Sequence, residues 1–310
     1  MIKIKTLLQI ILFVFGLQNA SAQLTNSTPE FIDYSKTEDS LLLRVIRSQK
    51  TISFGSSNIL RKNSAVVKEN TLVNFKSAKP GTKEKTAEDI AVERKESVIM
   101  IARLDKANNA KGAKVQVIAT GIVLSEDGVC ATNYHVMRPF LDEKMKPNNT
   151  DSLMFIANSK GEVCPIREIL SYNIDGDIAI FKIDPLNTRM KAIPLGKDAY
   201  VGAKVYAFTH PDGYFYYFST GNVARNTAIN TKGVFGNRMD ITADYAKGSS
   251  GGPIIDKFGN LVGMVSTTNS IYYRENQYTN QQTNLQMVVK STIPVQTFRR
   301  LIGSNTNSLK

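Results

Sequence analysis

Residues 248–253 read Gly-Ser-Ser-Gly-Gly-Pro and lie between two short runs of apolar and β-branched residues. A serine hydroxyl is a poor nucleophile at neutral pH, so it needs a base and N–H donors for the oxyanion that forms. Glycines suit this role, because a backbone without Cβ can turn sharply and direct its N–H groups at a substrate carbonyl. Ser250 is therefore a candidate nucleophile, with the N–H groups of Gly248 and Ser250 as oxyanion donors. A Ser-Gly turn joining two strands is the alternative.

A base and a carboxylate for this serine are found upstream in the chain. His135, one of two histidines, follows the strand-like run 128–134, where an imidazole could act as general base. Asp177 directly precedes the apolar run 178–181, and a buried carboxylate could orient that imidazole. Asp175 is the competitor, but Asp177 is preferred because it adjoins the buried strand. A lone histidine is more often structural, which is the alternative for His135.

The chain between these motifs is rich in short apolar runs separated by turn residues. Such runs, with little helical periodicity between them, favour an all-β sandwich or barrel. A short helix is expected at 86–96, capped by Thr86, and a closing helix at 294–301. The expected strands are 98–104, 115–124, 129–131, 153–157, 162–170, 178–183, 204–208, 214–223, 238–242, 252–255, 261–266 and 285–289.

The three motifs together resemble those of the trypsin-like peptidases, most closely the bacterial HtrA-type protease domain. The resemblance rests on Thr-Asn-Tyr-His-Val at 132–136, Asp-Ile-Ala at 177–179 and the run 248–253, in which Ser249 replaces the family's Asn. It extends from about Ile90 to Ile302. It implies two six-stranded antiparallel β-barrels over residues 86–302, with a short N-terminal helix and a C-terminal helix.

The resemblance also implies a function. His135, Asp177 and Ser250 would form the catalytic triad of a serine endopeptidase that works through an acyl-enzyme. The run 263–268, with Ser266, Thr267 and Thr268, would bind an extended protein or peptide substrate by adding a strand. A protease fold that serves as a catalytically silent binding scaffold is the alternative.

Substrate specificity and regulation are less well defined by the sequence. Asp244 lies six residues before Ser250, where trypsin carries the acidic group of its specificity pocket, and would favour cleavage after Arg or Lys unless Lys247 neutralises it. His210 is expected to be a turn residue. HtrA proteins usually carry a PDZ domain, and the tail 303–310 is too short for one, so none is expected.

The N-terminal residues predict export. Lys3 and Lys5 precede an apolar run at 7–17 and the small residues Ala20, Ser21 and Ala22, a pattern typical of a signal peptide cleaved after Ala22. A membrane anchor is the weaker interpretation, because the run is shorter than the roughly 20 residues that span a bilayer. The mature chain is expected in the periplasm or outside the cell.

The net charge of +12 is concentrated in one segment. Ten Lys or Arg against two Glu give residues 44–85 a charge of +8. Residues 23–85 look irregular and are interpreted as a basic propeptide, linker or appendage, which could contact anionic surfaces or simply be solvated. Nucleic acid is not an expected partner, because the basic residues 44–85 contain few aromatic residues, Phe54 and Phe75, and the chain is expected to be exported.

The two cysteines and the other polar residues predict no cofactor. Cys130 and Cys164 could form one disulfide in an oxidising compartment or remain buried free thiols. No metal-ligand cluster or phosphate loop is present in the sequence, so neither a metal nor a cofactor is expected. The oligomeric state stays open.

Overall fold

The computed structural model describes residues 29–105, 112–142, 145, 152–186, 189–275 and 282–303. The chain divides into Met1–Asp33 and Tyr34–Lys310, and the described part of the first unit contains neither helix nor strand. The predicted signal peptide and the tail from residue 304 onward lie outside the described residues. Across the described ranges, none of the helices has the length and apolar character needed to cross a bilayer.

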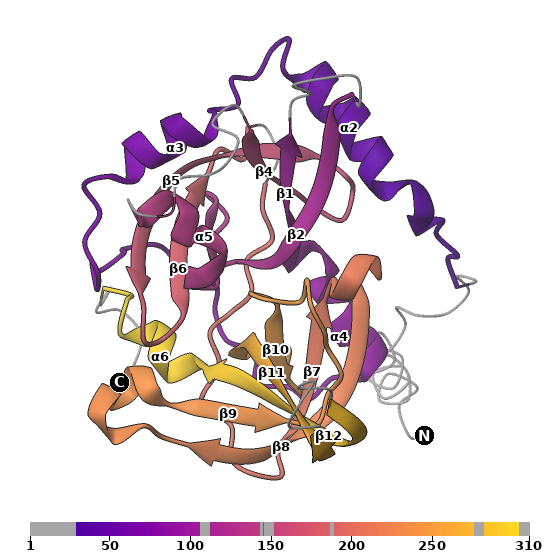
Figure 1. Ribbon diagram of the computed structural model, residues 1–310, viewed down its shortest axis with the longest axis vertical. Coiled ribbons are helices and arrows are strands. Elements are labelled where there is room, and N and C mark those ends of the chain that lie inside the picture. The colour runs from indigo at the N-terminus through magenta and orange to yellow at the C-terminus, as the bar shows by residue number, and fades with distance from the viewer. Residues whose placement is uncertain are drawn as a thin grey trace, which may run out of the picture. The chain divides into compact units, whose positions relative to one another are not determined.

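The first half of the domain is a closed antiparallel barrel (Figure 1). Its strands pair in the order β1-β2-β3-β6-β5-β4. They are β1 (Val98–Asp105), β2 (Lys114–Val123), β3 (Val129–Thr132), β4 (Leu153–Ala157), β5 (Val163–Asn173) and β6 (Ile178–Ile183).

The second half is another closed antiparallel barrel, with the order β10-β11-β12-β9-β8-β7. Its strands are β7 (Lys204–Thr209), β8 (Tyr217–Thr227), β9 (Arg238–Ile241), β10 (Pro253–Asp256), β11 (Leu261–Glu275) and β12 (Gln282–Pro294). The predicted all-β double barrel is therefore confirmed. β11 and β12 extend well beyond the predicted runs, since their polar outer residues pair with each other.

A single apolar cluster joins the two barrels. Val98, Ile122 and Ile180 of the first barrel are buried together with Tyr206 and Met264 of the second. Apolar burial contributes about 25 cal/mol per Å² removed from water, so this shared cluster holds the barrels against each other.

Two predicted helices are present. α4 (Ala87–Arg94) begins after Thr86, whose side-chain oxygen accepts a hydrogen bond from Asp89 N at 3.1 Å. α6 (Val295–Arg299) closes the described fold and buries Phe298. The 3₁₀ turn η2 (Lys95–Ser97) directly continues α4 and covers the end of the helix predicted at 86–96. The other described helical elements were not predicted: α2 (Thr37–Ser48), α3 (Ser57–Ser64), α5 (Tyr134–Leu141), and the 3₁₀ turns η1 (Tyr34–Lys36), η3 (Pro211–Gly213) and η4 (Asn230–Gly236).

The expectation of an irregular N-terminal segment is wrong for residues 34–75. α2 and α3 lie against the outside of the first barrel (Figure 1). α2 packs Leu41 and Val45 into one apolar cluster, and α3 buries Leu60 in another. Val73 N donates to Leu301 O at 2.9 Å, which ties the segment to the last described turn of the chain. The segment belongs to the folded unit.

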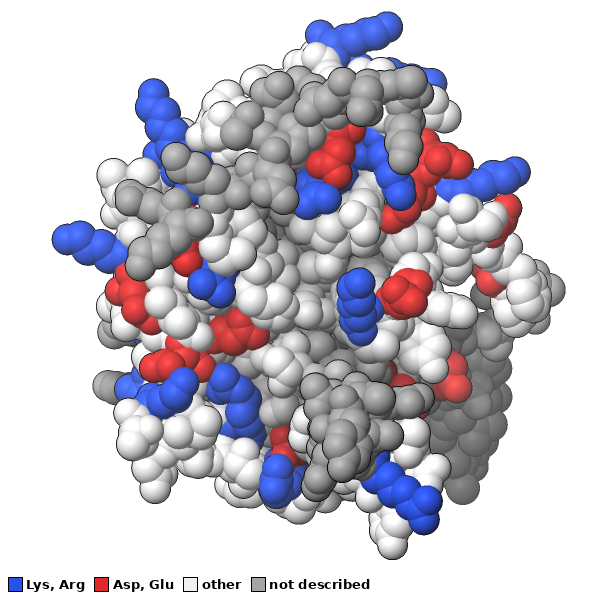
Figure 2. Space-filling view, viewed as in Figure 1, with Lys and Arg blue, Asp and Glu red and all other residues white. Residues whose placement is uncertain are grey.

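Some basic side chains of this segment form ion pairs or hydrogen bonds with the rest of the domain. Lys85 pairs with Glu93, and the Arg61 guanidinium donates to the carbonyl of Met145 at 2.8 Å. On the face in Figure 2, basic and acidic side chains are interspersed over the described surface, and no large patch of one sign is seen there. The segment is thus not a solvated linker.

Both cysteines are free and buried in the core of the first barrel. Burial raises the pKa of the Cys130 thiol and raises that of Cys164 to about 12. They remain neutral at physiological pH and pack as small apolar side chains.

Candidate active site

Three side chains from separate parts of the chain meet where the barrels face each other. His135 lies in the first turn of α5, directly after β3; Asp177 precedes β6; and Ser250 lies in the loop between β9 and β10. His135 Nδ1 is 3.0 Å from Asp177 Oδ1, and His135 Nε2 is 3.1 Å from Ser250 Oγ. The structure thus brings together the three residues predicted from the motifs.

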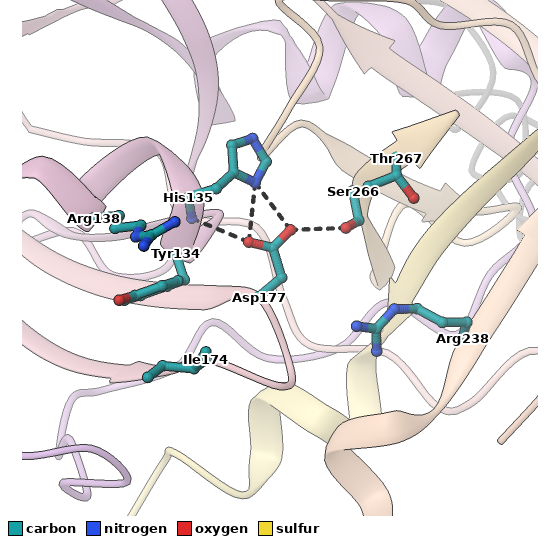
Figure 3. A pocket seen from close by; sticks show the side chains of 8 residues that line it. All are labelled: Tyr134, His135, Arg138, Ile174, Asp177, Arg238, Ser266 and Thr267. Carbon is teal, nitrogen blue, oxygen red and sulfur yellow. Dashed lines mark hydrogen bonds and ion pairs between the residues drawn. The ribbon is translucent and has the colours of Figure 1, made fainter. Parts of the chain in front are cut away.

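The Asp177 carboxylate is held from several sides (Figure 3). Oδ1 also accepts the backbone N–H of His135 at 3.1 Å, and Oδ2 accepts the Ser266 hydroxyl at 2.8 Å. Asn133 Nδ2 donates to the Asp177 carbonyl at 3.0 Å, and Asp177 adopts a positive φ of 53°, which Asp tolerates better than most residues. These bonds fix the carboxylate that orients the imidazole. Asp175, the competitor, instead pairs with Lys232 at 2.6 Å.

The loop around Ser250 needs its glycines. Gly248 has a φ of 90°, and a Cβ there would lie 2.6 Å from the His210 carbonyl oxygen. Thr120 of β2 clamps this loop: its N–H donates to Ser250 O at 2.9 Å, and its hydroxyl donates to Gly248 O at 3.0 Å. Sequence reasoning missed Thr120, because no local motif marks it.

The predicted oxyanion donors are the N–H groups of Gly248 and Ser250. Each belongs to a peptide unit whose carbonyl group is held by a hydrogen bond, and this bond fixes the direction of the N–H. Lys247 O accepts from Asp212 N at 2.6 Å, and Ser249 O accepts from Gly252 N at 2.9 Å. In a trans peptide the N–H points opposite to the C=O, so Gly248 N–H and Ser250 N–H point away from these partners. Among the described residues, neither N–H donates to a backbone carbonyl. This is the arrangement that the predicted oxyanion role of these two N–H groups requires.

The residues predicted to bind substrate fall into two groups. Ser266 is buried against Asp177, so its side chain positions the carboxylate, whereas Thr267 and Thr268 are exposed on β11. β10 pairs with β11 only from Leu261 to Met264, while β12 continues along the other edge. In the described part of the chain, residues 266–268 therefore keep one edge without a strand partner.

The geometry around Asp244 does not favour its expected role in a specificity pocket. Its side chain is 70% exposed and pairs with Lys290 of β12 at 2.8 Å. An exposed, paired carboxylate is not the buried charge of a specificity pocket, and the partner is Lys290 rather than Lys247. The expected preference for Arg or Lys loses its support.

His210 occupies the turn before η3, as expected, yet its ring is buried. Its Nδ1 accepts the Tyr216 N–H at 2.9 Å. Burial lowers the pKa of His210 to about 3. This histidine is neutral at physiological pH and structural.

A pocket of about 540 Å³ adjoins His135 and Asp177. Its lining includes Tyr134, Arg138, Ile174 and Arg238, beside His135 and Asp177 (Figure 3). The first four were not predicted. Arg238 lies in the second barrel and far along the chain from α5, so no sequence spacing connects them.

Comparison with known proteins agrees with this architecture. Residues 119–264 match the family described as a trypsin-like peptidase domain. Protease Do-like 1, chloroplastic, of Arabidopsis thaliana is 29% identical over 151 residues, 47% of this chain and 32% of that protein. Protease Do-like 5, chloroplastic, of the same plant is 23% identical over 205 residues, 64% of this chain and 60% of that protein.

A solved structure gives the same fold. The crystal structure of Deg5 superposes with a TM-score of 0.50 at 21% identity, covering 69% of this chain and 90% of that one. The matches thus span from 32% to 60% of the length of the two curated relatives. Residues 119–264 are thus similar to a trypsin-like peptidase domain, and the similarity to the Do-like proteases supports a serine protease domain of the HtrA type.

Proposed function

We propose that the protein is an exported serine endopeptidase with His135, Asp177 and Ser250 as its catalytic triad. The observation that carries the proposal is the continuous path from Ser250 Oγ through both ring nitrogens of His135 to Asp177, at 3.1 and 3.0 Å. In a trypsin-like domain this arrangement serves acyl transfer.

The proposed reaction has two halves. His135 Nε2 accepts the proton of Ser250 as Oγ attacks the peptide carbonyl, and the N–H groups of Gly248 and Ser250 stabilise the oxyanion. The imidazolium, held by Asp177, then protonates the leaving amine as the C–N bond breaks. Water, deprotonated by His135, attacks the acyl-enzyme, and the proton returns to Ser250 as the acid leaves.

The proposed substrates are extended protein segments. The open edge of β11 at residues 266–268 supports recognition by strand addition, which suits unfolded or flexible chains. The N-terminal pattern of basic, apolar and small residues supports export with cleavage after Ala22.

A Ser250→Ala variant tests the proposal. The chain from Gln23 and its Ser250→Ala counterpart would be incubated with casein, and the cleaved bonds mapped by mass spectrometry. We expect the wild type to cut and the variant to lose activity by a factor of about 10³ or more. A fluorophosphonate should label the wild type only. Equal casein cleavage by both proteins, or no cleavage and no label in either, overturns the proposal.

A further inference from the structure

The pocket beside His135 carries an unusual set of charges. Three charged groups line it in addition to the histidine: Asp177, Arg138 and Arg238. Asp177 is covered by His135 and Ser266, and its side chain is only 17% exposed. Both of its carboxylate oxygens are therefore already engaged in hydrogen bonds within the protein.

The two arginines differ in how they are held. Arg138, on α5, pairs with Asp142 one turn later at 3.2 Å and is half exposed. Arg238 donates to the carbonyls of Phe235, Asn237 and Asp175, at 2.9, 2.8 and 2.8 Å.

Those three acceptors are neutral carbonyl groups. Within the described residues, Arg138 pairs with Asp142 and Asp177 pairs with His135, but Arg238 makes no salt bridge. Arg238 is therefore the charged residue of the pocket lining that has no ionic partner in the described part of the chain. Burial lowers the pKa of Arg238, while Asp177 and Asp175 oppose this, and a guanidinium stays protonated at neutral pH. The pocket thus presents a fixed positive charge (Figure 3).

The position of the pocket indicates which part of a substrate could reach it. Its walls include His135 on one side and Ser266 and Thr267 of β11 on the other. A strand added along β11 directs successive side chains to opposite faces. If the residue before the scissile bond points toward the Ser250 loop, the second and fourth residues before that bond point toward His135, and the third does not.

We propose, resting on the peptidase function above, that this pocket binds an acidic side chain at the second or fourth substrate residue before the scissile bond. Arg238 is the main partner of the carboxylate, and Arg138 contributes a weaker attraction. Tyr134 and Ile174 supply apolar walls for the methylene groups of a glutamate.

Paired peptides test this proposal. Fluorogenic peptides built on a bond that the protein cuts in casein would carry Glu or Gln at the second, third or fourth residue before the bond. We expect Glu to raise kcat/KM about three- to tenfold over Gln at the second or fourth residue, and not at the third. The advantage should shrink as NaCl is raised, because salt screens a partly exposed pair.

Variants assign the effect to the arginines. Arg238→Gln should abolish most of the Glu advantage, measured within each variant as the ratio of kcat/KM for the Glu peptide to that for the Gln peptide, and Arg238→Lys should retain part of it. Arg138→Gln, at a more exposed site that tolerates change, should reduce the advantage partially. Arg189→Gln, an exposed arginine paired with Glu126 outside the pocket, is the matched control and should leave it unchanged.

The outcomes separate the two proposals. If Ser250 is labelled and casein is cut, but Glu gives no advantage at the second or fourth residue, the pocket proposal is overturned and the peptidase stands. An advantage that survives both Arg238→Gln and Arg138→Gln also overturns it. If nothing is cut or labelled, the peptidase proposal fails, and the pocket proposal fails with it.

Discussion

His210 shows how one buried residue can couple this fold to pH. It is 1% exposed, its ring packs edge-on against Tyr216 at a centroid distance of 4.6 Å, and its Nδ1 accepts the Tyr216 N–H. Burial lowers its pKa to about 3. The folded protein therefore keeps this ring neutral at pH values where the unfolded chain protonates it.

The sign of the resulting pH dependence follows from proton linkage. An unfolded histidine titrates near pH 6.5, so between about 6.5 and 3 the unfolded state binds one more proton than the folded state. The free energy of unfolding should fall by about 1.4 kcal/mol for each pH unit below 6.5 from this residue. Above pH 6.5 its contribution is constant.

His210→Asn tests this linkage, because an amide oxygen can still accept the Tyr216 N–H but has no proton to gain. We expect the variant to be less stable than the parent at pH 7.5 and to lose less stability down to pH 4.5. Urea unfolding at several pH values, in a Ser250→Ala background to prevent autolysis, measures both. Parallel pH profiles for parent and variant would contradict the assignment of this acid sensitivity to His210.

Single residues were predictable where a local motif carried them. His135, Asp177 and Ser250 each lie in a short pattern next to a buried strand, and the structure places them within hydrogen-bond distance. Asp244 was assigned by counting back from Ser250, and counting cannot tell which way the intervening loop turns its side chains. Arg238 carries no local pattern, since its role depends on a contact between barrels.

At the scale of elements, α2 is the part of the N-terminal segment that packs most deeply. Leu41 and Val45 lie one turn apart and are 2% and 0% exposed, in a cluster with Met100 and Phe155. Leu43, on the same helix, is 66% exposed. The same helix thus contains a buried leucine, Leu41, and an exposed leucine, Leu43, which can serve as the control for a substitution of Leu41.

Leu41→Ala should lower the free energy of unfolding by about 2–4 kcal/mol, since it leaves a cavity in a packed cluster. Leu43→Ala should change it by less than about 0.5 kcal/mol. Chemical denaturation of both variants, again in the Ser250→Ala background, gives the comparison. Equal effects would mean that α2 does not pack on the barrel and that the segment acts as a detachable arm.

The strands were easier to predict than the helices. The twelve described strands all overlap the predicted apolar and β-branched runs, because each strand contributes such residues to a buried barrel core. α3 buries a single large apolar residue, Leu60, among polar neighbours, and α5 contains Pro139, so neither has a clear helical pattern. α2 lacks a side-chain N-cap, and only the Leu41–Val45 spacing could have marked it.

At the scale of the whole domain, the candidate triad is divided between the barrels. His135 and Asp177 come from the first barrel and Ser250 from the second, so their geometry depends on how the barrels are joined. Thr120 lies at this junction and is fully buried. Its hydroxyl donates to Gly248 O at 3.0 Å and accepts from His210 N at 3.1 Å, which links β2 to two loops of the second barrel.

Thr120→Val removes this hydroxyl while keeping the shape of the side chain, and it leaves two buried backbone groups without a partner. We expect a loss of about 1–3 kcal/mol in the free energy of unfolding. With the carbonyl of Gly248 released, the loop that presents Ser250 should be held less firmly, and fluorophosphonate labelling should slow by about tenfold. Thr120→Ser retains the hydroxyl and should restore the labelling rate. A Thr120→Val protein that is destabilised yet labels at the parental rate would show that the apolar cluster alone aligns the barrels, and that the Thr120 hydroxyl contributes to stability without positioning Ser250.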